Sequence, residues 1–527
     1  MSRWAHRRFG IGAIAMAAAV ALAGCGDAPS SSTEPDTNEY PSEIALADDF
    51  NEDATFTFGY TAFPPSWDPT KSTSAADRIF YIPVYDGLFI EGVDGPEPGL
   101  VTDYVPNDDG TSVTMHLREG LTFSDGTPWD AEAAKFNLDR NRAEGSRIAG
   151  ELSMVTDVEA VDDMTLKVDT DGSIGALQVS LSTRGGMVVS PKAVESGVID
   201  DEPVGIGPYV TTAISPGVEA TYERTPDYWD PTAQNVAKRV HKFIADDQAR
   251  YNALVSGELD GAQVNPDQVN TVQEAGLLPV IKPSSLFLVM GMNSAMPPFD
   301  NIEVRKALNM AIDREGISQG LYDGLCTPQA TPFPKDGVAY NEEIGDGLDE
   351  YPYDPEKAKE ILEAEGVTDL KIDTLTPNVT IYTKFAEVVQ DNLADVGITV
   401  DVRPMPSEQL VQEFMIDKTA PTTSAVTTGI TDPNMLWGSF LAPNAPQNPG
   451  GEYDEEMEKY AKEGAASLDP AERNKGYSKM VEHWMERPPA MVPVCMIHLA
   501  AAFGDDISGV AQHTSGLPNM RHVAKSD

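Results

Sequence analysis

Basic residues are scarce in this chain. Its 527 residues include 37 lysines and arginines against 84 aspartates and glutamates, and the formal net charge at pH 7 is -47. Such an excess of negative charge repels phosphate backbones and anionic membrane surfaces, so we expect no nucleic-acid partner. The length exceeds what a single hydrophobic core supports, and the sequence therefore predicts at least two cores.

Cysteine and histidine are also few. Three cysteines exclude the disulfide-dense class of small secreted proteins, and the seven histidines show none of the spacings typical of a zinc site. Glycine-rich phosphate loops of the GxGxxG and GxxxxGK[ST] types are absent. Residues 316–320, Gly-Ile-Ser-Gln-Gly, match the Gly-x-Ser-x-Gly pattern of serine hydrolases, but they follow an amphipathic helix ending near Glu315 instead of the strand that this motif requires. We expect no metal, no cofactor and no enzymatic activity.

The amino-terminal residues carry a targeting pattern. Three arginines within the first eight residues precede an uncharged apolar run over 11–22, which is too short to span a bilayer and is typical of a secretory signal. The run ends in Leu22-Ala23-Gly24-Cys25, which resembles the bacterial lipobox. We expect residues 1–24 to be removed, Cys25 to be lipidated, and the exported chain to be anchored to the outer face of the cell membrane. The paired arginines leave both the general secretory route and the twin-arginine route open.

A polar segment separates this signal from the rest of the chain. Residues 25–49 are rich in Ser, Thr, Asp, Glu and Pro, the composition of a solvated, flexible tether. The two cysteines beyond the tether are Cys326 and Cys495. In an oxidising compartment two thiols are more often bridged than free, so we predict a disulfide between them, with two buried free thiols as the alternative.

Alternating hydrophobicity predicts antiparallel strands in the first third of the chain. Residues 55–60 alternate with a period of two and lead into a proline-rich corner. Residues 112–117 place Val113, Met115 and Leu117 on one face. A similar pattern over 155–168, with a bend at Asp162-Asp163, predicts a hairpin.

Helices and strands alternate in the second half. Asp300-Asn301-Ile302-Glu303 resembles a capping box ahead of an amphipathic helix, and Asp354 is placed to cap a second helix that ends before Gly366. A strand over 370–375, a helix stopped by Gly397 and a strand over 398–402 follow in that order. This order predicts a parallel α/β unit.

Several motifs, in one order from about Phe56 to His498, resemble the extracytoplasmic solute-binding proteins of family 5, which serve ABC importers and include oligopeptide-, dipeptide- and nickel-binding proteins. A set of motifs in the same order is more specific than any one of them. The motifs are Trp67-Asp68-Pro69, residues 117–128 (LREGLTFSDGTP), Gly205-Ile206-Gly207-Pro208-Tyr209, residues 226–230 (PDYWD), residues 254–260 (LVSGELD), Met292-Asn293-Ser294, residues 297–300 (PPFD), residues 305–308 (RKAL), residues 311–314 (AIDR), Asp432-Pro433, and Glu472-Arg473-Asn474 with Tyr477.

The resemblance implies an α/β periplasmic-binding-protein fold, in which two lobes flank a cleft. It also implies a monomer that captures a peptide or other small polar solute by hinge closure and delivers it to ABC permease subunits. A ligand-sensing surface receptor and a lipid-anchored hydrolase are the alternatives. The implied domains are a discontinuous lobe I over 50–74, 201–283 and 505–527, an extra subdomain over 75–199, and lobe II over 284–504.

Two segments are expected to form the rims of this cleft. The first is the corner with Tyr60, Phe63 and Pro64, and the second runs from Thr422 to Asp432. In peptide-binding relatives an Asp three residues before the acidic-Pro dipeptide holds the peptide's α-ammonium, whereas counting back from Asp432-Pro433 gives Gly429. A buried ammonium without a carboxylate is heavily penalised, so capture of free peptides in the usual pose is disfavoured. The predicted ligand-binding residues are Tyr60, Phe63, Pro64, Thr427, Thr428, Gly429 and Asp432.

Overall fold

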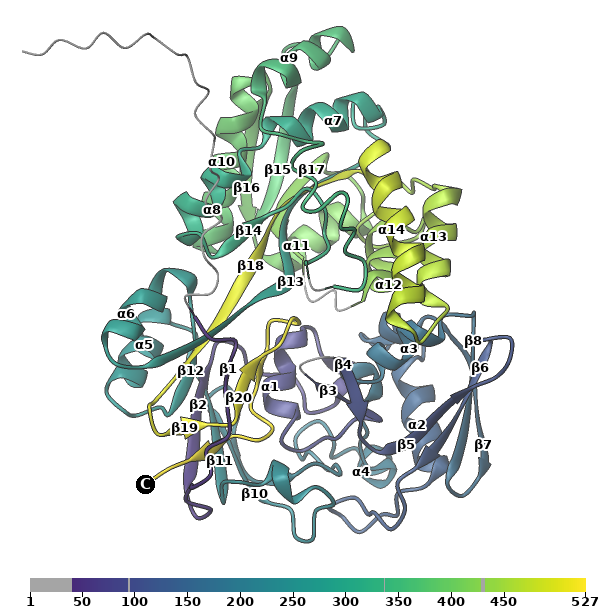
Figure 1. The fold of residues 1–527 in the computed structure, drawn as a ribbon, viewed down its shortest axis with the longest axis vertical. Helices are drawn as coiled ribbons and strands as arrows, with labels where there is room; N and C mark the ends of the chain where they lie inside the picture. Colours follow the sequence, from purple (N-terminus) through teal and green to yellow (C-terminus); the bar gives the residue numbers. More distant parts are fainter. Residues whose placement is uncertain (1–39, 93–94, 336, 428–431) are drawn as a thin grey trace, which may run out of the picture. The chain divides into compact units, whose positions relative to one another are not determined.

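Strands from widely separated parts of the chain meet in one large mixed sheet (Figure 1). The computed structural model describes residues 40–527 except 93–94, 336 and 428–431. The sheet has the hydrogen-bonded order β16 (Thr399–Met405), β15 (Lys371–Pro377), β17 (Thr422–Val426), β13 (Leu278–Met292), β18 (Met491–Phe503), β12 (Gly261–Val264), β2 (Thr55–Tyr60), β11 (Lys238–Phe243), β10 (Glu219–Arg224) and β9 (Tyr209–Ser215), and β14 (Cys326–Pro328) pairs with β18.

The antiparallel pair of β13 and β18 holds this sheet together. In the strand order it separates β16, β15 and β17 from β12, β2, β11, β10 and β9. Its register passes from Pro283 opposite His498 to Phe287 opposite Met496. The three residues 284–286 of β13 therefore oppose one residue of β18, which makes a β-bulge in the middle of the pair.

The predicted parallel unit of the second half is confirmed. β15 and β16 pair in parallel, and α10 (Thr380–Asp395) connects them. Gly397, which follows α10, has a φ of 86°, a conformation that glycine adopts at little cost.

The helix predicted after Asp300 differs from the expectation in two respects. Its cap is Asn301, whose side chain accepts a hydrogen bond from the Glu303 amide, and not Asp300. The helix α7 (Ile302–Ala311) also ends earlier than the apolar periodicity indicated, because Asp313 caps a new helix, α8 (Arg314–Tyr322). The next helix, α9 (Pro355–Ala364), begins at the predicted cap Asp354.

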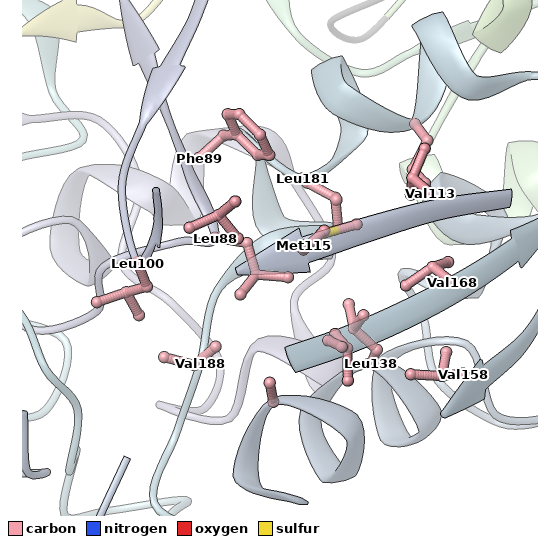
Figure 2. Packing of buried hydrophobic residues seen from close by; sticks show 14 of the residues in the cluster. Leu88, Phe89, Leu100, Val113, Met115, Leu138, Val158, Val168, Leu181 and Val188 are labelled. Carbon is pink, nitrogen blue, oxygen red and sulfur yellow. The ribbon is translucent and has the colours of Figure 1, made fainter. Parts of the chain in front are cut away.

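A separate antiparallel sheet has the order β5 (Val101–Pro106), β6 (Ser112–Leu117), β8 (Thr165–Thr170) and β7 (Val155–Asp162). The strand over 112–117 and the hairpin bent at Asp162-Asp163 are both as predicted. Figure 2 shows Met115 of β6 and Val168 of β8 near Leu138 of α2 (Ala131–Asn141), in a cluster of buried apolar side chains drawn mostly from residues 88–206.

Further buried clusters surround the large sheet, so the expectation of more than one core is confirmed. The residue boundaries of the lobes stay a prediction. None of the described helices is long and apolar enough to cross a bilayer. The remaining helices are α1 (Arg78–Tyr81), α3 (Ile174–Ser180), α4 (Pro191–Ser196), α5 (Asp247–Val255), α6 (Val269–Glu274), α11 (Ser407–Leu410), α12 (Pro433–Leu436), α13 (Glu455–Ala465) and α14 (Pro470–Glu486).

Small ribbons complete the fold. β3 (Phe89–Gly92) pairs with β4 (Gly95–Pro98), β1 (Glu43–Ile44) with β20 (Val510–Gln512), β20 with β21 (Pro518–Asn519), and β19 (Ile507–Ser508) with β22 (Ala524–Lys525). Near the carboxyl terminus, the Asn51 side-chain amide donates to an Asp527 carboxylate oxygen at 2.7 Å. The segment between β1 and β2 is thus hydrogen-bonded to residue 527.

Cys326 of β14 and Cys495 of β18 are joined in a disulfide, the bridged state that the sequence favoured. Their Cα atoms are 5.5 Å apart, although 169 residues separate them in the sequence. Both are buried. The bridge fastens β14 to the part of β18 that adjoins the bulge, where Cys326 pairs with Ile497.

Candidate functional site

A cavity of about 830 Å³ is lined by segments from distant parts of the chain. They are the β3–β4 ribbon, α3, the middle of β13, a proline-rich loop over 332–339, the starts of α12 and α14, and Thr514. Two smaller cavities, near Arg239 and Arg305, measure about 50 and 40 Å³ and have room only for a few water molecules. The larger cavity is the candidate ligand site.

One wall of the cavity holds a buried ion pair. An Arg473 Nη2 donates to an Asp432 oxygen at 2.5 Å, and the Tyr477 hydroxyl lies 3.1 Å from the same nitrogen. The other Asp432 oxygen accepts from the Asn434 amide at 2.9 Å and so caps α12. Burial opposes the charge of Arg473, but the attraction of Asp432 outweighs it and raises the pKa of Arg473.

Another part of the cavity lining holds a second ion pair. Glu91 of β3 forms an ion pair with Arg78 of α1, in which Arg78 Nη2 lies 2.8 Å from Glu91 Oε2. Burial alone would raise the pKa of Glu91, but the Arg78 guanidinium reverses this effect, and the net pKa is lowered. Both carboxylates that line the described part of the cavity, Glu91 and Asp432, are therefore neutralised within the protein.

Two further polar side chains of the cavity lining lack partners. Lys282 is half-buried and makes no ion pair or hydrogen bond with any part of the chain that the structure describes. Ser285, 4% exposed, has a buried hydroxyl without a hydrogen-bond partner. Both belong to the part of β13 that contains the bulge.

Only one of the predicted rim residues that the structure describes lines the cavity. Among them, Asp432 lines the cavity, and its carboxylate is engaged by Arg473. Tyr60 is 3% exposed in an apolar core, and the half-buried Phe63 packs in the same cluster, its ring 4.9 Å from that of Phe80. Pro64 is buried beside them, outside the cavity lining.

Thr427, from the second predicted rim, is buried and does not line the cavity. Its hydroxyl accepts from the Phe287 amide at 3.2 Å. Thr428 and Gly429 lie outside the residues that the structure describes, so the missing carboxylate at position 429 stays a sequence-based prediction.

Sequence reasoning missed the lining residues Lys282, Ser285, Glu91 and the loop over 332–339. One signal was present: Lys282-Pro283-Ser284-Ser285 interrupts an otherwise apolar run that continues to Met292. A lysine and two serines inside a buried strand need partners or a cavity.

The Gly-x-Ser-x-Gly match does not form a nucleophile elbow. Ser318 lies within α8, is 1% exposed, and donates its hydroxyl to the Cys326 carbonyl at 2.6 Å. Within the described ranges there is also no group of three or more His, Cys, Asp and Glu side chains that could hold a metal ion.

The sequence matches a family model described as bacterial extracellular solute-binding proteins, family 5 Middle, over residues 95–448. The glutathione-binding protein GsiB of Escherichia coli strain K12 is 27% identical over 465 residues, which cover 84% of this chain and 89% of GsiB. GsiB of Pectobacterium atrosepticum is 30% identical over 357 residues, covering 66% of this chain and 68% of the relative.

Solved structures resemble the fold closely. The binding protein AgaA of A. tumefaciens R10, in complex with agropinic acid, has a TM-score of 0.78 and 22% identity and covers 90% of this chain and 99% of its own. DppA of Helicobacter pylori, in complex with the peptide STSA, has a TM-score of 0.76 and 22% identity, with 92% and 99% covered. The predicted α/β periplasmic-binding-protein fold and the resemblance to family 5 are confirmed.

Proposed function

Because the chain belongs to the bacterial extracellular solute-binding proteins of family 5, we propose that it captures a peptide or another small polar solute and delivers it to an ABC permease. Proteins of this family are binding proteins and not enzymes, and they act outside the cytoplasm. The identity of the solute and the attachment to the membrane are the parts that need experiments.

The cavity of about 830 Å³ is the observation that carries this proposal. Its volume falls within the range of about 300–1,000 Å³ that is typical of small-molecule sites. Its walls come from β3, β4 and α3 in the first part of the chain and from β13, α12 and α14 further along. A solute that contacts both walls would favour the closed arrangement, which the permease would then recognise.

Attachment to the membrane forms the second part of the proposal. We place the lipid on Cys25, after removal of residues 1–24, with residues 25–49 as the tether. One acyl-modified residue and a solvated tether would keep the binding protein beside its permease and leave the body free to bind solute.

The charges of the cavity bear on the class of solute. Glu91 and Asp432 are held by Arg78 and Arg473, so among the described lining residues neither carboxylate is free to bind an α-ammonium. This supports the sequence-based expectation drawn from Gly429, that free peptides are not bound in the usual pose. Glutathione, named for the GsiB relatives, carries an α-ammonium and is therefore an informative ligand to test.

Thermal unfolding in the presence of candidate solutes tests the proposal. Unmodified dipeptides, tripeptides and glutathione should raise the melting temperature little. The cognate solute should raise it in proportion to the logarithm of its concentration above the dissociation constant, because only the folded state binds. Native mass spectrometry of protein purified from its own host would identify a retained solute. Micromolar binding of unmodified peptides would contradict the restriction on ammonium ligands and make ordinary peptide uptake the function.

A further inference from the structure

We propose that Lys282 and Ser285 form a subsite for a carboxylate group of the captured solute. This inference rests on the proposed function and specifies the chemistry of its ligand: a small solute that carries a carboxylate and lacks an ammonium group. Charge balance, strand geometry and the unsatisfied hydroxyl each support it.

One ammonium group in the described lining of the cavity has no counter-ion. Of the charged residues that line its described part, Glu91 pairs with Arg78 and Asp432 with Arg473, whereas Lys282 has no partner. A partly buried ammonium without a counter-ion is unfavourable. A ligand carboxylate would supply both the missing negative charge and the hydrogen-bond acceptor.

The bulge in β13 explains how both side chains reach the same cavity. In a regular strand, residues 282 and 285 would point to opposite faces, because their separation is odd. Residues 284–286 oppose only Ile497, and the Ser284 hydroxyl donates to the Ile497 carbonyl at 2.6 Å. The two extra residues leave Pro283 and Phe287 on one face, so the regular alternation is lost only within residues 284–286, and Ser285 lines the same cavity as Lys282. Bulges commonly re-aim side chains beside binding sites.

The Ser285 hydroxyl adds a directional donor. It is buried and unpartnered, although its own backbone amide donates to the Thr514 carbonyl at 2.6 Å and so holds the residue in place. A buried hydroxyl without a partner is costly and is usually satisfied by water or ligand. One ammonium and one hydroxyl suit a singly charged carboxylate.

A paired ligand panel tests the subsite on the full chain. The panel contains N-acetyl dipeptides, hydroxy acids and sugar acids, each accompanied by its primary amide. We expect at least one acid to raise the melting temperature of the wild type, and its amide to bind at least tenfold more weakly. Lys282→Met should weaken the acid about ten- to a hundredfold, the usual effect of losing a charge-assisted hydrogen bond, and leave the amide unchanged.

Three variants complete the test. Lys282→Arg should keep most of the affinity for the acid, and Ser285→Ala should lose less than Lys282→Met. Lys359→Met removes an exposed lysine of α9 that makes no ion pair with any described residue, and this variant should bind the acid as the wild type does. Without ligand, Lys282→Met should melt no lower than the wild type, because an unpaired ammonium is removed and no ion pair or hydrogen bond with the described residues is lost.

The outcomes separate the subsite from the function. If amides bind as tightly as their acids, or if Lys282→Met binds the acid unchanged, the carboxylate subsite is wrong while solute binding stands. If neither series binds and no solute is retained in protein from the host, the proposed function itself is contradicted.

Discussion

At the residue scale, two buried histidines couple stability to pH. His241 lies among the rings of Phe58, Phe80 and Tyr222, and its Nδ1 is 2.8 Å from the Ile79 carbonyl. Burial lowers the pKa of His241 to about 3, and it lowers the pKa of His498 to about 4. Both side chains are therefore neutral in the folded protein at pH 5, whereas in the unfolded chain, with a pKa near 6.5, both would be protonated.

Acidification should therefore destabilise the protein. Between about pH 6.5 and pH 3 the unfolded state binds a proton at position 241 that the folded state does not, so the free energy of unfolding falls as the pH falls. From pH 7 to pH 5 this effect is worth about 2 kcal/mol. In His241→Phe, the free energy of unfolding should differ between pH 7 and pH 5 by about 2 kcal/mol less than in the wild type, as measured by urea unfolding. His116→Gln, at an exposed position of β6, should not change it. An unaltered pH dependence in His241→Phe would contradict this account.

At the scale of elements, α13 and α14 approach closely through glycine. A Cβ at Gly476 of α14 would lie 2.4 Å from the Gly464 backbone nitrogen of α13. We expect Gly476→Ala to lower the free energy of unfolding by about 1–3 kcal/mol, because overpacking outweighs the better helix propensity of alanine. The matched control is Gly320→Ala in α8, where a Cβ meets no atom within 4 Å, and it should stabilise by up to about 1 kcal/mol. If both substitutions changed the free energy of unfolding equally in denaturant unfolding, the close approach of α13 and α14 at Gly476 would not be the cause of the destabilisation.

Elements with strong local patterns were predictable from the sequence. β2, β6 and the β15–α10–β16 unit follow from a period of two, a period of 3.6 and a glycine stop. β17 was read as a polar rim because it contains Thr422, Thr423 and Ser424, but it lies between β15 and β13. Two of its hydroxyls are hydrogen-bonded inside the protein: Thr422 donates to the Asp373 carbonyl at 2.8 Å, and the Ser424 hydroxyl bonds that of Thr374 at 3.1 Å.

The cavity lining was harder to predict for the same physical reason. Local periodicity reports which face of one element is buried, but it does not report which distant element covers that face. Phe63 follows a strand in a proline-rich corner, as a rim residue would, yet it packs on Phe80. Ser285 lines the cavity together with Lys282 because it lies in a bulge of β13, and the bulge depends on pairing with β18, more than 200 residues later.

At the scale of the whole molecule, the proposed lipid on Cys25 determines where the protein resides. No described helix could hold it in a bilayer, and its excess of negative charge disfavours adsorption to anionic lipids. Cys25→Ala should therefore move the protein from the membrane fraction to the soluble fraction when cells expressing it are fractionated. The disulfide cysteines offer a control, since a Cys326→Ala, Cys495→Ala double variant should stay in the membrane fraction. Unchanged membrane association of Cys25→Ala would rule out lipidation as the anchor.

The hydrogen bond between Asn51 and Asp527 indicates how the connectivity of the chain could be changed. Residues 51 and 527 lie close enough to be joined by a short linker, and a fold in which two such segments meet generally tolerates circular permutation. New ends could be opened at the exposed turn around Gly217, between β9 and β10, which contributes nothing to the cavity lining. Such a permutant would carry a fused fluorescent reporter at this turn, away from residues 51 and 527, and leave the β13–β18 pair uncut.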